Sequence, residues 1–151
     1  MKTPSRATAR FFRRLIPSRL EAVDAVCLEL RAFMTASGLA ADSFSVELIA
    51  RECLNNTVIH GNQNQPRNMA CLSLSLGRRW LRLQIADEGV GFSWRQACRT
   101  AADPAASSGR GLAIGNYYAD RIGFNQRGNQ ITLWLDNSGK AKRHLHGNIH
   151  A

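Results

Sequence analysis

Residues 47–64, with the sequence ELIARECLNNTVIHGNQN, have the spacing of an amphipathic helix that must pack on an apolar layer. Ser43 or Ser45 can cap the start of this helix, and Gly61 can end it. Its apolar face consists of Val46, Ile49, Ala50, Cys53, Leu54, Thr57 and Val58. We therefore expect other parts of the chain to supply an apolar surface for this helix.

A second face of the same helix is polar. Glu52, Asn56 and His60 follow one another at intervals of four, so each lies about 40° further round the helix than the one before. A carboxylate, an amide and an imidazole thus form a stripe beside the apolar face. Such a stripe is either a solvated helix surface or the wall of a chemical site, and this segment alone leaves both interpretations open.

Two alternating segments predict a β-hairpin with one apolar face. In residues 69–76 leucines alternate with serines, and in residues 80–86 apolar side chains again occupy every second position. Residues 77–79 (GRR) turn between them. The apolar face of the hairpin must be covered, most simply by two helices packed on the same side.

The flanking segments complete an α+β pattern. Residues 10–16 predict a short edge strand, and a helix that starts at residues 17–18 ends at Gly38. The apolar face of this helix is formed by Leu20, Val23, Val26, Cys27, Leu30, Phe33 and Met34. Near the other end of the chain, residues 122–135 read as a second hairpin around a turn at residues 128–129.

The first hairpin runs into Asp87-Glu88-Gly89-Val90-Gly91, a D-x-G-x-G pattern. Two alternating glycines after a strand let the backbone turn sharply and approach a ligand closely, while Asp87 points a carboxylate into the same space. The same pattern also occurs in plain turns. Taken alone, it leaves a turn and a ligand site as alternatives.

A second glycine motif, Gly109-Arg110-Gly111-Leu112, precedes a predicted helix. Glycines at a helix N-terminus leave free N–H groups and the positive end of the helix dipole facing outward, which favours phosphate binding. A tight turn is the alternative. We expect Ile114, Tyr118 and Ile122 to share one side of this helix, and residues 93–108, rich in Ala, Ser and Pro, to form a cover.

Composition limits the class of protein. The 151 residues suit a single domain, and no apolar run approaches the ~18 residues that a membrane span needs. Four separated cysteines favour reduced thiols and a cytoplasmic setting.

The net charge of +9 invites a nucleic-acid interpretation, but Lys and Arg gather near both ends with no recognition motif between them. Basic tails that solubilise, or that contact an acidic protein, account for this charge equally well.

The order of the three motifs resembles the ATP-binding domain of the GHKL superfamily. The motifs are E-x-x-x-N-x-x-x-H-G, D-x-G-x-G and G-R-G-L, and the chain is most similar to the bacterial anti-sigma-factor serine kinases of the RsbW type. The resemblance implies a Bergerat-type α+β two-layer sandwich, with a mixed, mostly antiparallel sheet covered on one face by helices. This domain would span residues 10–136, between a basic tail at 1–9 and a basic, histidine-containing tail at 137–151.

The same resemblance implies ATP and Mg²⁺ as cofactors and assigns roles to individual residues. Glu52 would be the general base or the residue that positions water and the substrate hydroxyl. Asn56 would be the Mg²⁺ ligand, and Asp87 the acceptor for the adenine amino group. Thr132 would help to fix adenine from the last strand. The other residues assigned to nucleotide binding are His60, Gly89, Gly91, Gly109, Arg110, Gly111 and Leu112.

The function implied is that of a cytoplasmic, homodimeric protein-serine kinase with no membrane association. It would bind a sigma factor and transfer the γ-phosphate of ATP to a serine of an anti-anti-sigma factor. Three alternatives stay open: a non-catalytic ATP-binding partner-switching module, a stand-alone histidine-kinase-type ATPase domain, and a nucleic-acid binder driven by charge. The last is disfavoured because the basic residues gather near the two ends and no nucleic-acid recognition motif lies between them, so we do not expect direct nucleic-acid binding.

Overall fold

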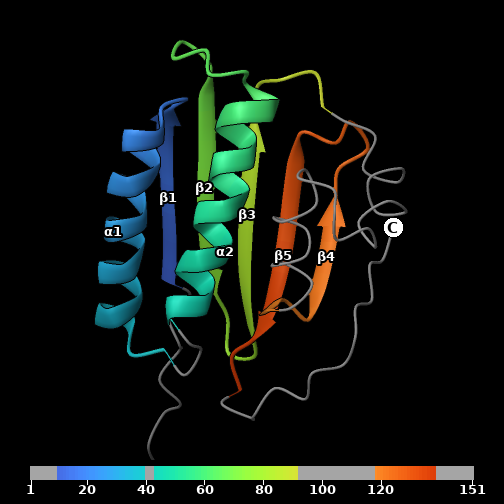
Figure 1. Ribbon diagram of the computed structural model, residues 1–151. Coiled ribbons are helices and arrows are strands. Elements are labelled where there is room, and N and C mark those ends of the chain that lie inside the picture. The colour runs from blue at the N-terminus through green and yellow to red at the C-terminus, as the bar shows by residue number, and fades with distance from the viewer. Residues whose placement is uncertain (1–9, 40–42, 92–117, 139–151) are drawn as a thin grey trace, which may run out of the picture.

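The computed structural model describes residues 10–39, 43–91 and 118–138. These residues form two layers, a five-stranded sheet and two helices that lie on one face of it, over the first three strands (Figure 1). The expected α+β two-layer architecture is therefore confirmed. In chain order the elements are β1 (Arg10–Pro17), α1 (Leu20–Ser37), α2 (Ser43–Asn56), η1 (Thr57–Gly61), β2 (Met69–Leu76), β3 (Trp80–Asp87), β4 (Arg121–Phe124) and β5 (Gln130–Asp136).

The strands lie in the order β1-β2-β3-β5-β4, and each described pairing is antiparallel. The edge strand and both hairpins predicted from alternation are thus confirmed, whereas the expected parallel component is not found among the described strands. The register brings Leu74 opposite Leu83, and Leu83 opposite Leu133. All three side chains are buried on the side of the sheet that carries the helices, so the face that alternation marked as apolar is the core face.

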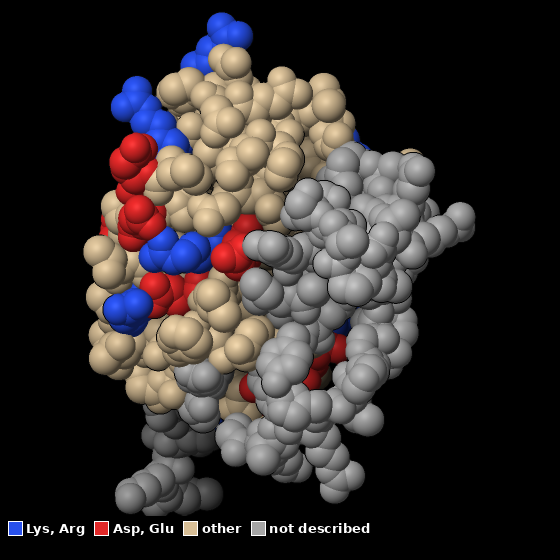
Figure 2. Space-filling view, viewed as in Figure 1, with Lys and Arg blue, Asp and Glu red and all other residues tan. Residues whose placement is uncertain are grey.

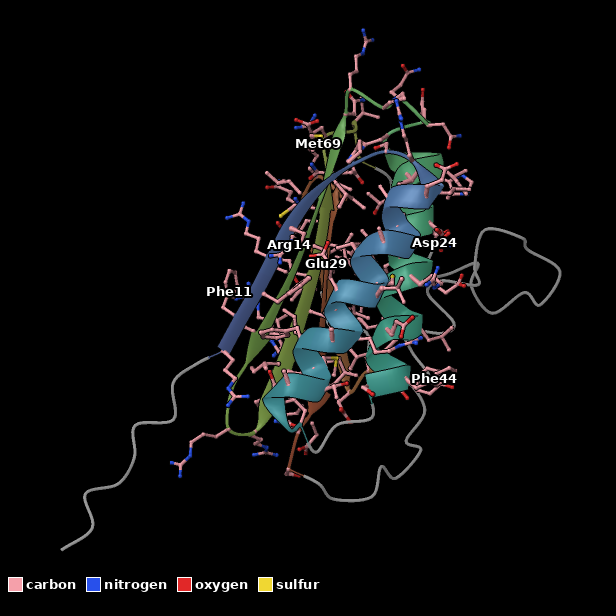
Figure 3. The ribbon with its side chains drawn as sticks, turned by 90° about the vertical axis from the view of Figure 1, so that its left-hand side faces the viewer. Phe11, Arg14, Asp24, Glu29, Phe44 and Met69 are labelled. Carbon is pink, nitrogen blue, oxygen red and sulfur yellow. The ribbon has the colours of Figure 1, made fainter. Side chains whose placement is uncertain are left out.

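The opposite face of the sheet carries exposed side chains. Seen from the side, Phe11 on β1 points away from the helices, while Arg14 points toward Glu29 on α1 (Figure 3). Phe11 and Leu15 are 58% and 60% exposed. Phe12 and Ile16, the alternate residues, are buried in the core, so β1 follows the period of two that its sequence predicts.

Helix α1 buries the predicted apolar face with one exception. Gly38 adopts φ 60° directly after the helix, as expected for the glycine that ends it. Leu20 is 47% exposed and does not join the core. The helix also begins at Leu20 and not at residues 17–18, because Ser18 turns inward and its Oγ donates to the Asn68 carbonyl at 2.8 Å.

The helix that carries the polar stripe is not uniform. It begins at Ser43, so Ser43 and Ser45 lie inside α2 and not before it, and it stays α-helical only to Asn56. Residues Thr57–Gly61 form a π-helical turn, η1, in which the Asn62 N–H donates to the Thr57 carbonyl at 2.8 Å. Gly61 is the last helical residue, as predicted, but the widened turn breaks the regular spacing of four between Asn56 and His60.

The structure describes only part of the C-terminal half of the chain. Ile122, which we expected both on one side of the preceding helix and at the start of the second hairpin, lies in β4 opposite Leu133. The hairpin assignment is the correct one, because the apolar side chain of Ile122 completes the core row of the sheet. The predicted cover at 93–108 and the helix that follows it lie outside the described residues. Within residues 10–39, 43–91 and 118–138, no helix has the length and hydropathy that a membrane crossing requires.

Three of the four cysteines lie in described segments as free thiols. Cys27 and Cys53 are buried, and burial raises the pKa of Cys27 to about 11 and that of Cys53 to about 12. Both thiols are therefore protonated at neutral pH and act as small apolar side chains of the helix layer.

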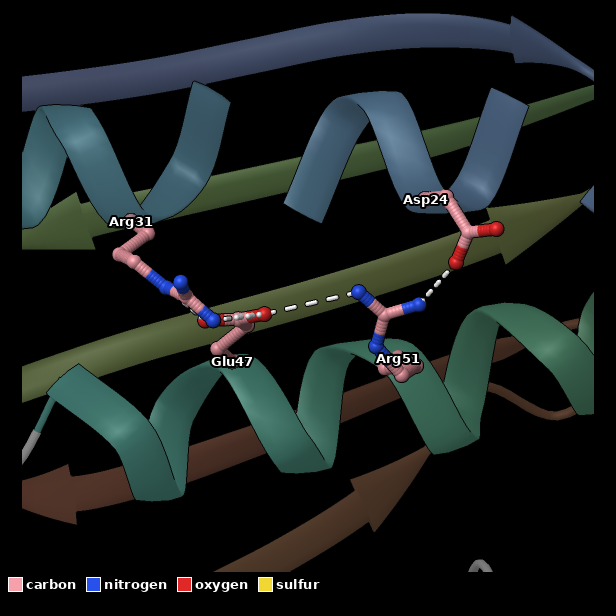
Figure 4. Close-up of polar contacts among 4 residues, drawn as sticks. All are labelled: Asp24, Arg31, Glu47 and Arg51. Carbon is pink, nitrogen blue, oxygen red and sulfur yellow. Dashed lines mark hydrogen bonds and ion pairs between the residues drawn. The ribbon is translucent and has the colours of Figure 1, made fainter. Parts of the chain in front are cut away.

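Helices α1 and α2 are joined by a chain of charges that lies across their outer surface (Figures 2 and 4). Glu47, only 5% exposed, accepts two hydrogen bonds from Arg31, at 2.5 Å from Nε and 2.9 Å from Nη2. Arg51 lies 3.5 Å from the same carboxylate and also pairs with Asp24. The buried acid is thus held between two guanidinium groups, which fixes α2 against α1.

We expect Glu47→Gln to lower the free energy of unfolding by about 1–2 kcal/mol, because the neutral amide no longer compensates the charges of Arg31 and Arg51, and Asp24 pairs only with Arg51. Chemical denaturation measures this loss. The matched control is Glu29→Gln, which removes one half of an exposed pair with Arg14 and should cost less than about 0.5 kcal/mol. Equal losses in the two variants would contradict the role given to Glu47.

Candidate functional site

The C-terminal end of η1 meets the end of β3 at one edge of the two layers (Figure 1). There the backbone of Gly61 lies directly against the side chain of Asp87. A Cβ atom added to Gly61 would lie 2.3 Å from Asp87 Oδ2 and 2.7 Å from its Cγ. The first two sequence motifs, separate along the chain, therefore adjoin in the fold.

The two glycines of D-x-G-x-G also make approaches that exclude side chains. A Cβ on Gly89 would lie 2.2 Å from the Gly61 carbonyl oxygen and 2.9 Å from Asp87 Oδ1. Gly91 adopts φ 83°, and a Cβ there would lie 1.9 Å from the Arg127 carbonyl oxygen. Backbone alone can occupy these positions, so the surroundings of the Asp87 carboxyl group depend on glycine at 61 and 89.

Asp87 lies on the helix-facing side of the sheet, because it pairs with the buried Ala70 and continues the core row of β3. Its Oδ1 accepts the N–H of Gly89 at 2.7 Å. Among the described residues, no group donates a hydrogen bond to Oδ2. Burial raises the pKa of Asp87, while the Gly89 hydrogen bond and the charge of Arg127 oppose this shift. Within the described part of the chain, the site thus offers a half-buried carboxylate whose Oδ2 has no hydrogen-bond donor.

Sequence reasoning missed two asparagines that hold the backbone beside this carboxylate. Asn62 Oδ1 accepts the N–H of Glu88 at 3.1 Å. Asn129 exchanges two bonds with Asp87, one from the Asp87 N–H to its own carbonyl and one from its Nδ2 to the Asp87 carbonyl, both 2.9 Å. The available signal is an asparagine directly after a glycine at 61–62 and again at 128–129, where the sequence analysis assigns only a helix end and a turn.

The stripe on the central helix divides at the π turn. Glu52 and Asn56 are half-buried, and neither side chain forms a hydrogen bond or ion pair with another described residue. His60, beyond the start of η1, is exposed. Within the described residues, the carboxylate and the amide thus lie without a partner on the helix whose last residue, Gly61, adjoins Asp87. The imidazole does not continue the stripe as a regular α-helix would place it.

Thr132 is not brought to the same side of the sheet as Asp87. It pairs with Gln84 on β3 and with Gly123 on β4, whereas the adjacent Leu133 pairs with the core residues Leu83 and Ile122. Because side chains alternate along a strand, Thr132 faces away from the helices. Its expected contact with adenine is not supported by this register. The β5 residue that reaches Asp87 is Asn129, just before the strand.

Gly109, Arg110, Gly111 and Leu112 lie outside the described residues, so their expected place near phosphate stays a prediction. The described residues contain no cluster of three or more His, Cys, Asp or Glu side chains that could hold a metal ion. An oxygen-preferring cation at Asn56 would thus have to take most of its ligands from a bound phosphate group and water. Mg²⁺ is usually coordinated in this way.

Comparison with known proteins supports the resemblance inferred from the motifs. A family model described as the histidine kinase-like ATPase domain matches residues 16–135. The anti-sigma F factor of Shouchella clausii is 36% identical over 73 residues, which are 46% of this chain and 50% of that protein. The anti-sigma F factor of Halalkalibacterium halodurans is 30% identical over 81 residues, covering 51% and 56%. The chain thus spans about half the length of these relatives.

Proposed function

The chain belongs to the family of histidine kinase-like ATPase domains, and from this premise we propose that it is an ATP-binding regulator with protein-serine kinase activity. The observation that carries the proposal is the Asp87 carboxylate, half-buried against glycine backbone, whose Oδ2 accepts no hydrogen bond from another described residue. Adenine presents an amino group that can donate to this oxygen, whereas guanine presents a carbonyl at the same ring position. ATP should therefore be strongly preferred over GTP.

In this proposal Asn56 supplies an amide oxygen to Mg²⁺, which in turn neutralises the phosphates when it is bound. Glu52, one helical turn before it, accepts the proton of the attacking serine hydroxyl. The residues proposed to close on the phosphates are Gly109, Arg110, Gly111 and Leu112. His60 and Thr132, given nucleotide contacts by the resemblance, are the least supported members of the set, because one is exposed and the other faces away from the helices.

The partners proposed follow from the names of the relatives. Two proteins similar to this chain are called anti-sigma F factors, so we propose a sigma factor as the sequestered partner and an anti-anti-sigma factor as the serine substrate. We further propose a cytoplasmic homodimer, with residues 10–136 as the nucleotide-binding domain and the two basic tails outside it. The proposal thus has two parts, ATP binding and phosphoryl transfer to a serine.

Calorimetry with Mg-ATP followed by intact-mass measurement of a candidate serine acceptor tests both parts. ATP uptake with addition of one phosphoryl group to the acceptor is the expected result. ATP uptake without transfer to any acceptor would favour the non-catalytic partner-switching module. Transfer to a histidine would favour the histidine-kinase-type domain, and no ATP uptake by folded protein would overturn the proposal.

Gly61→Ala should weaken ATP binding by about tenfold or more, because its Cβ would displace the Asp87 carboxyl group, 2.3 Å away. Titration calorimetry checks the affinity. The matched control is Gly123→Ala on the other face of the sheet, where the added Cβ would lie 3.3 Å from the Trp134 ring and near no other described residue. If both variants bind ATP like the wild type, Gly61 does not shape the site.

A further inference from the structure

Two asparagines hold the backbone at Asp87 from opposite directions, and we propose that they are positioning residues that set the selectivity of the site for the 6-amino group of adenine. Asn62 comes from the end of η1, and Asn129 from the loop between β4 and β5. Neither is proposed to touch nucleotide. They act through the carboxylate of Asp87, and the inference rests on the proposed function.

Asn62 connects four parts of the fold. It is 1% exposed, and its Nδ2 donates to Ser18 Oγ at 2.8 Å and to the Met69 carbonyl at 3.1 Å, while its Oδ1 accepts the Glu88 N–H. Its own N–H closes the π turn on Thr57. One buried amide therefore fixes the end of η1, the start of β2 and the exit of β3 relative to one another.

The Glu88 side chain strengthens the same junction, because its carboxylate accepts the N–H of Met69 at 2.5 Å. The residue after Asp87 is thus bonded at its backbone by Asn62 and at its side chain by the start of β2. This leaves the peptide between Asp87 and Glu88 little freedom to rotate, and the direction of the Asp87 side chain depends on that peptide.

Asn129 bonds the backbone N–H and carbonyl of Asp87, and hydrogen bonds within its own loop fix its position. Asn125 Oδ1 accepts N–H groups from Gly128, Asn129 and Gln130, at 2.8 Å, 3.1 Å and 3.2 Å. Asn125 Nδ2 also donates to Asn129 Oδ1 at 2.7 Å, which leaves Asn129 Nδ2 directed at the Asp87 carbonyl. The loop is therefore a rigid support for Asp87 and more than a connection between two strands.

Such support matters for selectivity because a hydrogen bond weakens steeply with misalignment. If the backbone at 87–88 relaxes, Oδ2 no longer meets a donor at a fixed position, and the advantage of a ligand with an amino group over one without it declines. A role confined to overall stability would weaken the binding of both ligands equally.

The test compares ATP with purine riboside triphosphate, which lacks the 6-amino group, in Asn62→Ala and Asn129→Ala. We expect wild-type protein to prefer ATP by about 100-fold or more. Each variant should reduce this ratio by about tenfold, mainly by weakening the binding of ATP. The matched control is Asn68→Ala, whose side chain forms no hydrogen bond with another described residue and which should keep the wild-type ratio.

The Asn62→Ala and Asn129→Ala variants test the inference independently of each other. If Asn62→Ala does not fold, Asn129→Ala, which leaves the buried Asn62 junction intact, decides the question by the same ratio. An unchanged ratio in folded variants, with wild-type protein binding ATP selectively, overturns this inference alone. Failure of wild-type protein to bind ATP overturns the proposed function itself, so the two failures are distinguishable.

Discussion

Asp87→Asn should weaken ATP binding by about 100-fold or more. Two donors require acceptors at this side chain: the Gly89 N–H, which already uses Oδ1 at 2.7 Å, and the adenine amino group proposed for Oδ2. A carboxylate supplies two acceptors, whereas an amide supplies one and places an N–H₂ group at the other position. Either orientation of the asparagine leaves one donor facing another, although the shape is preserved. Titration calorimetry gives the affinity.

The control for this substitution is Asp24→Asn, an equivalent change on the exposed outer surface of α1, which should bind ATP like the wild type. Selective loss at position 87 would tie the effect to the site and not to the charge of the protein. Unchanged ATP binding by Asp87→Asn would remove the observation on which the proposed function depends.

The same variant should be at least as stable as the wild type without ligand. Burial raises the pKa of Asp87, so its ionised form is penalised in the folded state at neutral pH. The neutral asparagine avoids this cost. As the pH falls through the raised pKa and below the ordinary value of 3.8, the carboxyl group is protonated in both folded and unfolded chains, and the advantage of the variant should disappear. Denaturation at neutral and acidic pH measures this change.

Local periodicity was enough to predict most elements of both layers. The leucines of β2 and β3 recur at every second position and all face the helices, as alternation requires. Gly38 and Gly61 end their helical segments where the sequence predicts. The proximity of Gly61 to Asp87 was expected only from the order of the motifs, because no local pattern specifies which two distant segments adjoin.

Features that depend on pairing between distant segments could not be predicted in the same way. The face on which Thr132 lies is set by the register of β5 against β3, and an offset of one residue would reverse it. The π turn at Thr57–Gly61 is closed by Asn62, whose side chain is engaged by residues from three other segments. Such contacts exist only in the folded chain, so the Gly-Asn pair at 61–62 does not show which distant segments Asn62 joins.

Glu52→Gln should reduce phosphoryl transfer to the serine acceptor by about 100-fold and leave ATP affinity within about threefold of the wild type. The glutamine keeps the size of the side chain and its hydrogen-bonding oxygen, but it cannot take a proton from the attacking hydroxyl. Glu52 forms no hydrogen bond or ion pair with another described residue, so its removal should not disturb the fold. Rates from intact-mass time courses and affinities from calorimetry separate the two effects.

Glu29→Gln provides the matched control, because it makes the same chemical change on α1, where Glu29 pairs with Arg14 on the outer surface. It should transfer phosphate at the wild-type rate. If Glu52→Gln also does so, the proton is taken by another group or by water, and Glu52 is no more than part of a solvated helix face. If Glu52→Gln instead loses ATP affinity in proportion to its rate, the carboxylate acts in binding and not in the chemical step, because a residue needed only in the transition state leaves ground-state affinity unchanged.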